Sequence, residues 1–122
     1  MNTSKPRTEG LLAWQWSNYR TAHTDRQNLL MHALSAPVFI LGGLALPAAL
    51  ATGAWWLAPA GLAGMLAAVA VQGRTHRREY AAPAPFSGPL DVAARLFAEQ
   101  WVTFPRYVLS GEFGRAWRSA AA

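Results

Sequence analysis

The sequence predicts an all-α integral membrane protein built on a two-helix transmembrane hairpin with an amphipathic helix on each side. The chain has 122 residues, and no Asp, Glu, Lys or Arg occurs between Arg26 and Arg74. Thr52-Gly53 divides this charge-free stretch into two apolar runs, and both ends of the chain are basic and rich in aromatic residues. Because a membrane-crossing helix needs roughly 20 apolar residues, each run is long enough to cross.

The N-terminal part is expected to form a disordered leader over residues 1–8 and then an amphipathic helix that opens at Thr8 and Glu9. Residues 9–118 form one helical membrane domain, and residues 119–122 are expected to be a frayed tail. Aromatic and apolar residues recur along one face of the first helix, which is typical of a helix lying at the headgroup level. These residues are Leu12, Trp16, Tyr19 and His23.

The two spans are expected at residues 29–51 and 54–72, with Thr52-Gly53 as the turn. Thr24 and Gln27 fit a capping box, so the first span is predicted to start at Asp25. The alternative is a buried helical hairpin in a soluble bundle. It is disfavoured because soluble helices seldom lack charge on every face for so long.

Basic residues lie before the first span and after the second, whereas the connecting turn has no charge. The positive-inside bias therefore places both termini in the cytoplasm. The Ala- and Arg-rich composition suggests a bacterial source, and hence an inner-membrane location. The net charge of +5 suits anionic headgroups. No motif supports nucleic-acid binding, and the absence of cysteine excludes disulfides, thiolate metal sites and covalently attached haem.

A Pro-rich connector over residues 81–89 leads to a second amphipathic helix. Ser87, Pro89 and Asp91 mark its start, and Pro105 is expected to end or kink it. Asp91, Arg95 and Glu99 are spaced four apart and predict an i,i+4 charge ladder opposite the apolar stripe. Its apolar stripe consists of Leu90, Ala93, Ala94, Phe97, Trp101 and Phe104.

The three histidines of the chain are predicted to meet at the cytoplasmic edge of the membrane. Counted from the turn, His32 is about 20 residues back and His76 about 23 forward, so their depths differ by roughly 5 Å. A bend at Thr24 allows His23 to reach the same level.

Three converging imidazoles are a common metal site, and they suit zinc or ferrous iron. Tyr19, Asn28 and Glu79 are the polar groups expected to orient these rings and to belong to the catalytic site.

The spacing of Tyr19, His23, Asn28, His32 and Pro37 resembles the first motif of a family of small helical membrane proteins. That family includes the endoplasmic-reticulum 2-hydroxy fatty acid dioxygenase of fatty-acid alpha-oxidation. Its second motif, a His followed closely by Glu and a Pro-containing connector, is similar to His76, Glu79 and Pro83 here. The resemblance extends over roughly residues 19–109.

The resemblance implies Fe(II) held by His23, His32 and His76, with zinc as the alternative metal. It further implies dioxygenase chemistry on 2-hydroxy fatty acids, in which oxidative decarboxylation releases a fatty acid one carbon shorter. Arg74, Arg77 and Arg78 would attract the substrate carboxylate, while the acyl chain stays among the helices or in lipid.

Two other functions remain open from the sequence. The chain could be a non-enzymatic membrane scaffold or partner-binding protein whose histidines anchor helices. In that case it would form a stable homo- or hetero-oligomer. It could also bind haem between two histidines. A scaffold would contain no bound metal, so metal analysis distinguishes it from the metalloenzyme. A haem-binding protein would be recognised by its absorption spectrum.

Overall fold

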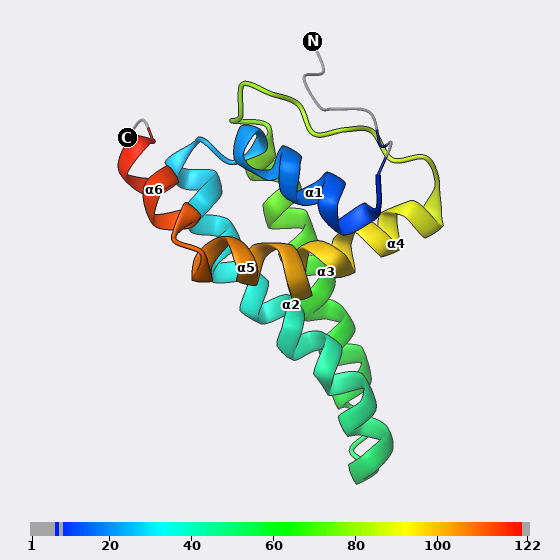
Figure 1. Cartoon of the computed structure of the whole chain (residues 1–122). Coiled ribbons are helices and arrows are strands. Elements are labelled where there is room, and N and C mark those ends of the chain that lie inside the picture. The colour runs from blue at the N-terminus through cyan, green and yellow to red at the C-terminus, as the bar shows by residue number, and fades with distance from the viewer. Residues whose placement is uncertain (1–6, 8, 121–122) are drawn as a thin grey trace.

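The computed structural model describes residue 7 and residues 9–120, and the described part of the chain is helical with no strand. Figure 1 shows a long hairpin whose upper half is surrounded by shorter helices. The all-α prediction is therefore confirmed. The predicted leader and the end of the predicted tail lie largely outside the described residues. The elements are α1 Leu11–Tyr19, η1 Arg20–Ala22, α2 Arg26–Thr52, α3 Leu57–His76, α4 Pro89–Ala98, η2 Glu99–Thr103, α5 Phe104–Leu109 and α6 Glu112–Ser119.

The hairpin consists of α2 and α3, and its turn falls at the predicted place. Gly53 ends α2 with φ 74°, a left-handed conformation in which glycine has no steric penalty. The start of α2 differs in detail from the predicted capping box. Asp25, rather than Thr24, caps the helix by accepting a hydrogen bond from the Asn28 amide. The Thr24 hydroxyl instead donates to Glu79, which the sequence pattern could not reveal.

Close contact between the two hairpin helices depends on Gly42 and Gly61. A methyl group at either position would overlap the carbonyl oxygen of the other, so both must lack a side chain. Small residues at such crossings let helix backbones approach closely. Just above this crossing, Phe39, Met65 and Ala68 form a buried apolar cluster.

A nearly continuous helical arm, formed by α4, η2 and α5, crosses the hairpin (Figure 1). The helix does not end at Pro105, which lies in the first turn of α5. The segment Glu99–Thr103 just before it is a π-helix, and the Phe104 amide bonds the Glu99 carbonyl five residues back. Such π turns are rare and occur frequently at functional sites. The arm packs on α2 where Phe97 meets Phe39, with ring centroids 5.2 Å apart.

The helix α6 was not predicted, and Ser119, expected in the frayed tail, is its last residue. Gly111, with φ 86°, forms the sharp turn that separates α6 from α5. The Arg26 guanidinium ties α6 to the start of α2, donating to the Trp117 and Ala120 carbonyls. α6 is therefore held against the N-terminal end of α2.

Both α2 and α3 are long and apolar enough to cross a membrane, with mean hydropathies of 2.0 and 1.2. Most of their side chains do not pack inside the protein. Large apolar side chains are exposed along the hairpin and on the arm: Leu30, Leu34, Val38, Leu41, Leu44, Leu50, Leu62, Leu66, Leu90, Phe97, Trp101, Val102, Val108 and Leu109.

Candidate metal centre

The three histidines converge from three separate elements. His23 follows η1, His32 lies in the second turn of α2, and His76 is the last residue of α3. Their ring centroids are 4.6 Å apart for His23 and His32, and 4.9 Å for each of the other two pairs. The chain leaves the helical conformation at residues 23–25, and this break brings His23 back to the level of His32, as predicted.

Backbone carbonyls fix the orientation of two of the rings. His23 Nδ1 donates to the Tyr19 carbonyl at 2.8 Å, and His32 Nδ1 donates to the Asn28 carbonyl at 2.9 Å. A carbonyl oxygen can only accept, so the ring proton of each neutral imidazole resides on Nδ1. The lone pairs then lie on the two Nε2 atoms, which face each other at 3.3 Å. This is the arrangement of metal-ligating histidines.

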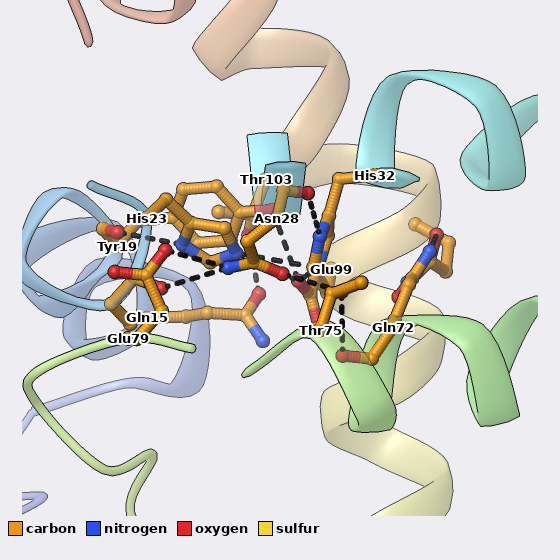
Figure 2. Close-up of polar contacts among 12 residues, drawn as sticks. Gln15, Tyr19, His23, Asn28, His32, Gln72, Thr75, Glu79, Glu99 and Thr103 are labelled. Carbon is orange, nitrogen blue, oxygen red and sulfur yellow. Dashed lines mark hydrogen bonds and ion pairs between the residues drawn. The ribbon is translucent and has the colours of Figure 1, made fainter. Parts of the chain in front are cut away.

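Glu99, which sequence reasoning missed as a site residue, is the fourth member of the group. Its Oε1 atom lies 3.3 Å from His32 Nε2 and 3.7 Å from His23 Nε2 (Figure 2). The ligand atoms of His23, His32, His76 and Glu99 all lie within 4.8 Å of one another. In a tetrahedral site with bonds of about 2.1 Å, neighbouring ligand atoms are about 3.4 Å apart. The three distances among the ligand atoms of His23, His32 and Glu99, at 3.3 to 3.7 Å, are close to this spacing.

The electrostatics of the group call for a cation. Burial lowers the pKa of His23 well below its ordinary value, and the adjacent His32 lowers it further. Burial alone would raise the pKa of the Glu99 carboxyl. Hydrogen bonding and charge attraction from His32, aided by His23 and His76, instead lower it to about 2. Low proton affinity at His23 and an ionised Glu99 therefore lie side by side, and a proton or a metal ion among the four groups balances the carboxylate charge.

His76 supplies a further observation that favours a ligand. Its Nδ1 atom is buried and has no hydrogen-bond partner among the described residues. A buried polar atom without a partner is costly and uncommon. A metal ion bound among the four groups suits this donor set, because imidazole nitrogens and a carboxylate oxygen are ligands of both zinc and iron.

Tyr19, predicted as a site residue, contacts the cluster in two ways. Its ring stacks on His23 with centroids 3.8 Å apart, and its hydroxyl donates to Glu99 Oε1 at 3.0 Å. Burial and the Glu99 charge raise the pKa of Tyr19 well above its ordinary value. The phenol therefore stays neutral and acts as a hydrogen-bond donor that fixes the carboxylate.

Glu79 and Asn28, also predicted as site residues, lie beside the group rather than in it. Glu79 accepts hydrogen bonds from the Thr24 and Asp25 amides, from the Thr24 hydroxyl and from Asn28 Nδ2 (Figure 2). Asn28 Oδ1 accepts from the Thr75 hydroxyl on α3. These bonds hold the segment after His23 against both hairpin helices and so set the positions of the rings.

The structure does not bring the predicted carboxylate-binding arginines to the imidazoles. Arg74 and Arg77 line a separate groove on the hairpin, and Arg78 pairs with Asp25 at 3.0 Å. A small pocket of about 80 Å³ opens onto Tyr19, His23, His76 and Glu99, and the arginine that lines it is Arg95. Arg95 donates to the Ala84 and Pro85 carbonyls, so it holds the Pro-rich connector beside this pocket.

The fold and the site together describe an all-helical chain with two apolar helices long enough to cross a membrane and a histidine–glutamate group that could hold a metal ion. In comparisons with known proteins, no family model, no curated protein and no solved structure matches the chain.

Proposed function

We propose that this chain is a membrane enzyme in which His23, His32, His76 and Glu99 bind ferrous iron, and that it oxidises 2-hydroxy fatty acids. The observation that carries the proposal is the convergence of three imidazoles and the Glu99 carboxylate, whose ligand atoms lie within 4.8 Å of one another, with His23 and His32 oriented by backbone carbonyls. Such orientation prepares a metal site before the ion arrives.

Ferrous iron is the preferred ion because it takes six ligands, and four protein groups leave two positions for substrate or dioxygen. Bound iron would supply the activation of dioxygen. The overall reaction converts a 2-hydroxy acid and O₂ into CO₂, water and a fatty acid one carbon shorter. The protein residues bind, orient and shield: Tyr19 fixes Glu99, while Glu79 and Asn28 hold the chain around His23.

A membrane location supports an acyl substrate. The exposed apolar side chains of the hairpin and the arm would contact lipid, and the arm carries Glu99 at its centre. An acyl chain could therefore stay in the apolar phase while its polar head enters the pocket beside Arg95. We place the protein in a bacterial inner membrane, with both termini at the cytoplasmic face.

Metal analysis by mass spectrometry tests the proposal first. Detergent-purified wild-type protein, loaded anaerobically with ferrous iron and desalted, is expected to retain about one iron per chain. His32→Ala should retain almost none, because a buried ligand is lost without a substitute. The matched control is Glu9→Gln, which changes an exposed carboxylate on the N-terminal side of α1 and should keep the iron.

The activity test follows on the iron-loaded protein. Release of ¹⁴CO₂ from 1-¹⁴C-labelled 2-hydroxy fatty acid under oxygen is expected for the wild type and not for His32→Ala. Retention of zinc instead of iron would redirect the search toward hydrolysis. A metal-free protein that runs as a stable oligomer would support the scaffold function, and a Soret band would indicate haem.

A further inference from the structure

A second pocket, of about 420 Å³, lies between η1 and the segment after it, α5 and α6, and it shares only His23 with the small pocket that opens onto Glu99. Its lining combines charged and polar side chains with the small side chains of two alanines. The residues that line it include Arg20, His23, Tyr107, Glu112, Arg115 and Ala116. The proposed iron chemistry uses none of these groups except His23.

Tyr107 indicates that the pocket takes a ligand. The residue is only 2% exposed, and its hydroxyl is buried without a hydrogen-bond partner among the described residues. The ring is held by edge-on contacts with Tyr19 at 4.9 Å and with Phe113 at 6.5 Å between centroids. A fixed, buried and unsatisfied donor costs stability unless something accepts its proton.

The charges of the lining define the kind of acceptor. Glu112 pairs with Arg20 at 2.8 Å and with Arg115 at 2.5 Å, so one carboxylate already bridges the two guanidinium groups. Each guanidinium has further N–H donors to offer, because it carries five. Arg20 and Arg115 bring two positive charges to the lining and Glu112 brings one negative charge, which leaves room for one more anion of single charge.

We propose that this pocket binds the carboxylate of an organic acid, with Arg20, Arg115 and the Tyr107 hydroxyl as donors. The carboxylate complements the net positive charge, and planar guanidinium groups match its two oxygens. The methyl groups of Ala116 and Ala120, which also line the pocket, would accommodate the first carbons of the acid. The site is built without the metal and does not depend on the proposed iron chemistry.

Equilibrium binding of hexanoate tests the inference, with the uncharged hexanamide as the matched ligand. The full chain is used in phosphatidylcholine nanodiscs after treatment with a chelator, so that no metal can bind the acid. We expect saturable binding of one hexanoate per chain and at least tenfold weaker binding of hexanamide. Arg115→Gln and Tyr107→Phe should each weaken hexanoate binding about ten- to a hundredfold, as expected for losing a hydrogen bond to a charged group.

Two controls separate this site from other causes. Arg118→Gln removes an arginine from the same helix that does not line the pocket, and it should leave binding unchanged. His32→Ala should also bind hexanoate normally, even though it loses the iron site. Tyr107→Phe should melt no lower than the wild type without ligand, because its hydroxyl bonds no described group.

Several results would overturn the inference. Equal binding of hexanamide, or equal weakening by Arg118→Gln, would show that the carboxylate is not recognised in this pocket. Loss of hexanoate binding in His32→Ala would show that the acid binds at the imidazoles and not in this pocket. If nanodiscs with phosphatidylglycerol abolish hexanoate binding, a lipid phosphate occupies the pocket, and the carboxylate assignment is wrong.

Discussion

Two carboxylates, the buried Glu79 and the partly buried Glu99, act on the imidazoles in different ways. Every hydrogen bond of Glu79 comes from a group of the chain: the Thr24 and Asp25 amides, the Thr24 hydroxyl and Asn28. Glu99 accepts from the Tyr19 hydroxyl and otherwise faces the Nε2 atoms of His32 and His23, at 3.3 and 3.7 Å. Glu79 therefore stabilises the fold around the site, whereas Glu99 is available to a metal.

Isosteric amides at the two positions separate these roles. Glu79→Gln replaces a hydrogen-bond acceptor with an NH₂ group, which would face the N–H and O–H donors that now bond the carboxylate. The free energy of unfolding, measured on chelator-treated protein, should therefore fall by about 1–3 kcal/mol. Saturating metal should still load one ion per chain. Glu99→Gln should instead weaken metal affinity by about 10–100-fold. Thermal melting and competition with a metal chelator measure the two quantities. If Glu79→Gln lost metal and Glu99→Gln kept it, Glu79 would be the metal ligand and Glu99 the residue that stabilises the fold.

At the scale of the elements, the hairpin is held together by the contact of Gly42 with Gly61. We expect Gly61→Ala to lower the stability of the folded protein by about 1–3 kcal/mol, because its methyl group would overlap the Gly42 carbonyl oxygen. Gly73→Ala is the matched control. It lies in the same helix with open space around it, and alanine there should raise stability by up to about 1 kcal/mol. Melting temperatures in detergent compare the two, and a destabilised Gly73→Ala beside a stable Gly61→Ala would contradict the packing argument.

The hairpin and the meeting of the histidines could be predicted from the sequence, because hydropathy and helix rise depend only on composition and spacing. The contribution of Glu99 could not. Asp91, Arg95 and Glu99 have the spacing of an i,i+4 ladder, yet among these residues the structure contains only the Arg95–Asp91 pair, at 3.6 Å. The π turn at Glu99–Thr103 shifts the hydrogen-bond register, and no local pattern predicts it. Proline at position 105 was the one signal of irregular helix geometry there.

The arm was predicted as an amphipathic helix, but the target of its polar face was not. Gln100, which follows Glu99 in the chain, is fully buried and exchanges two amide hydrogen bonds with Gln72 on α3, at 3.0 and 2.6 Å. Such pairing depends on how the arm crosses the hairpin, which is a tertiary property. The sequence showed a polar face and left open whether water or other helices would satisfy it.

At the scale of the whole molecule, the proposed membrane location predicts how the exposed apolar surface would lie in a bilayer. The exposed stripe on α2 runs from Leu30 to Leu50, about 30 Å of helix, which equals the hydrocarbon thickness of a membrane. Trp55 and Trp56 at the tip of the hairpin are exposed and suit the opposite interface. Trp101 of the arm packs on Gly43, about 15 Å before the turn at Gly53. With the turn at the far interface, a crossing hairpin would place the Trp101 ring near the middle of the bilayer and the rest of the arm in the nearer leaflet, with its exposed apolar side chains against lipid.

Single cysteines test this placement directly, since the chain has none of its own. In intact cells, a membrane-impermeant maleimide is expected to label Trp56→Cys from outside, because the tip reaches the far interface. Ser119→Cys on α6 should be labelled only after permeabilisation. Leu109→Cys, on the exposed face of the arm, should resist labelling from both sides until detergent removes the lipid. A protected tip together with an accessible residue 109 would instead mean that the hairpin enters one leaflet and the arm lies above the lipid.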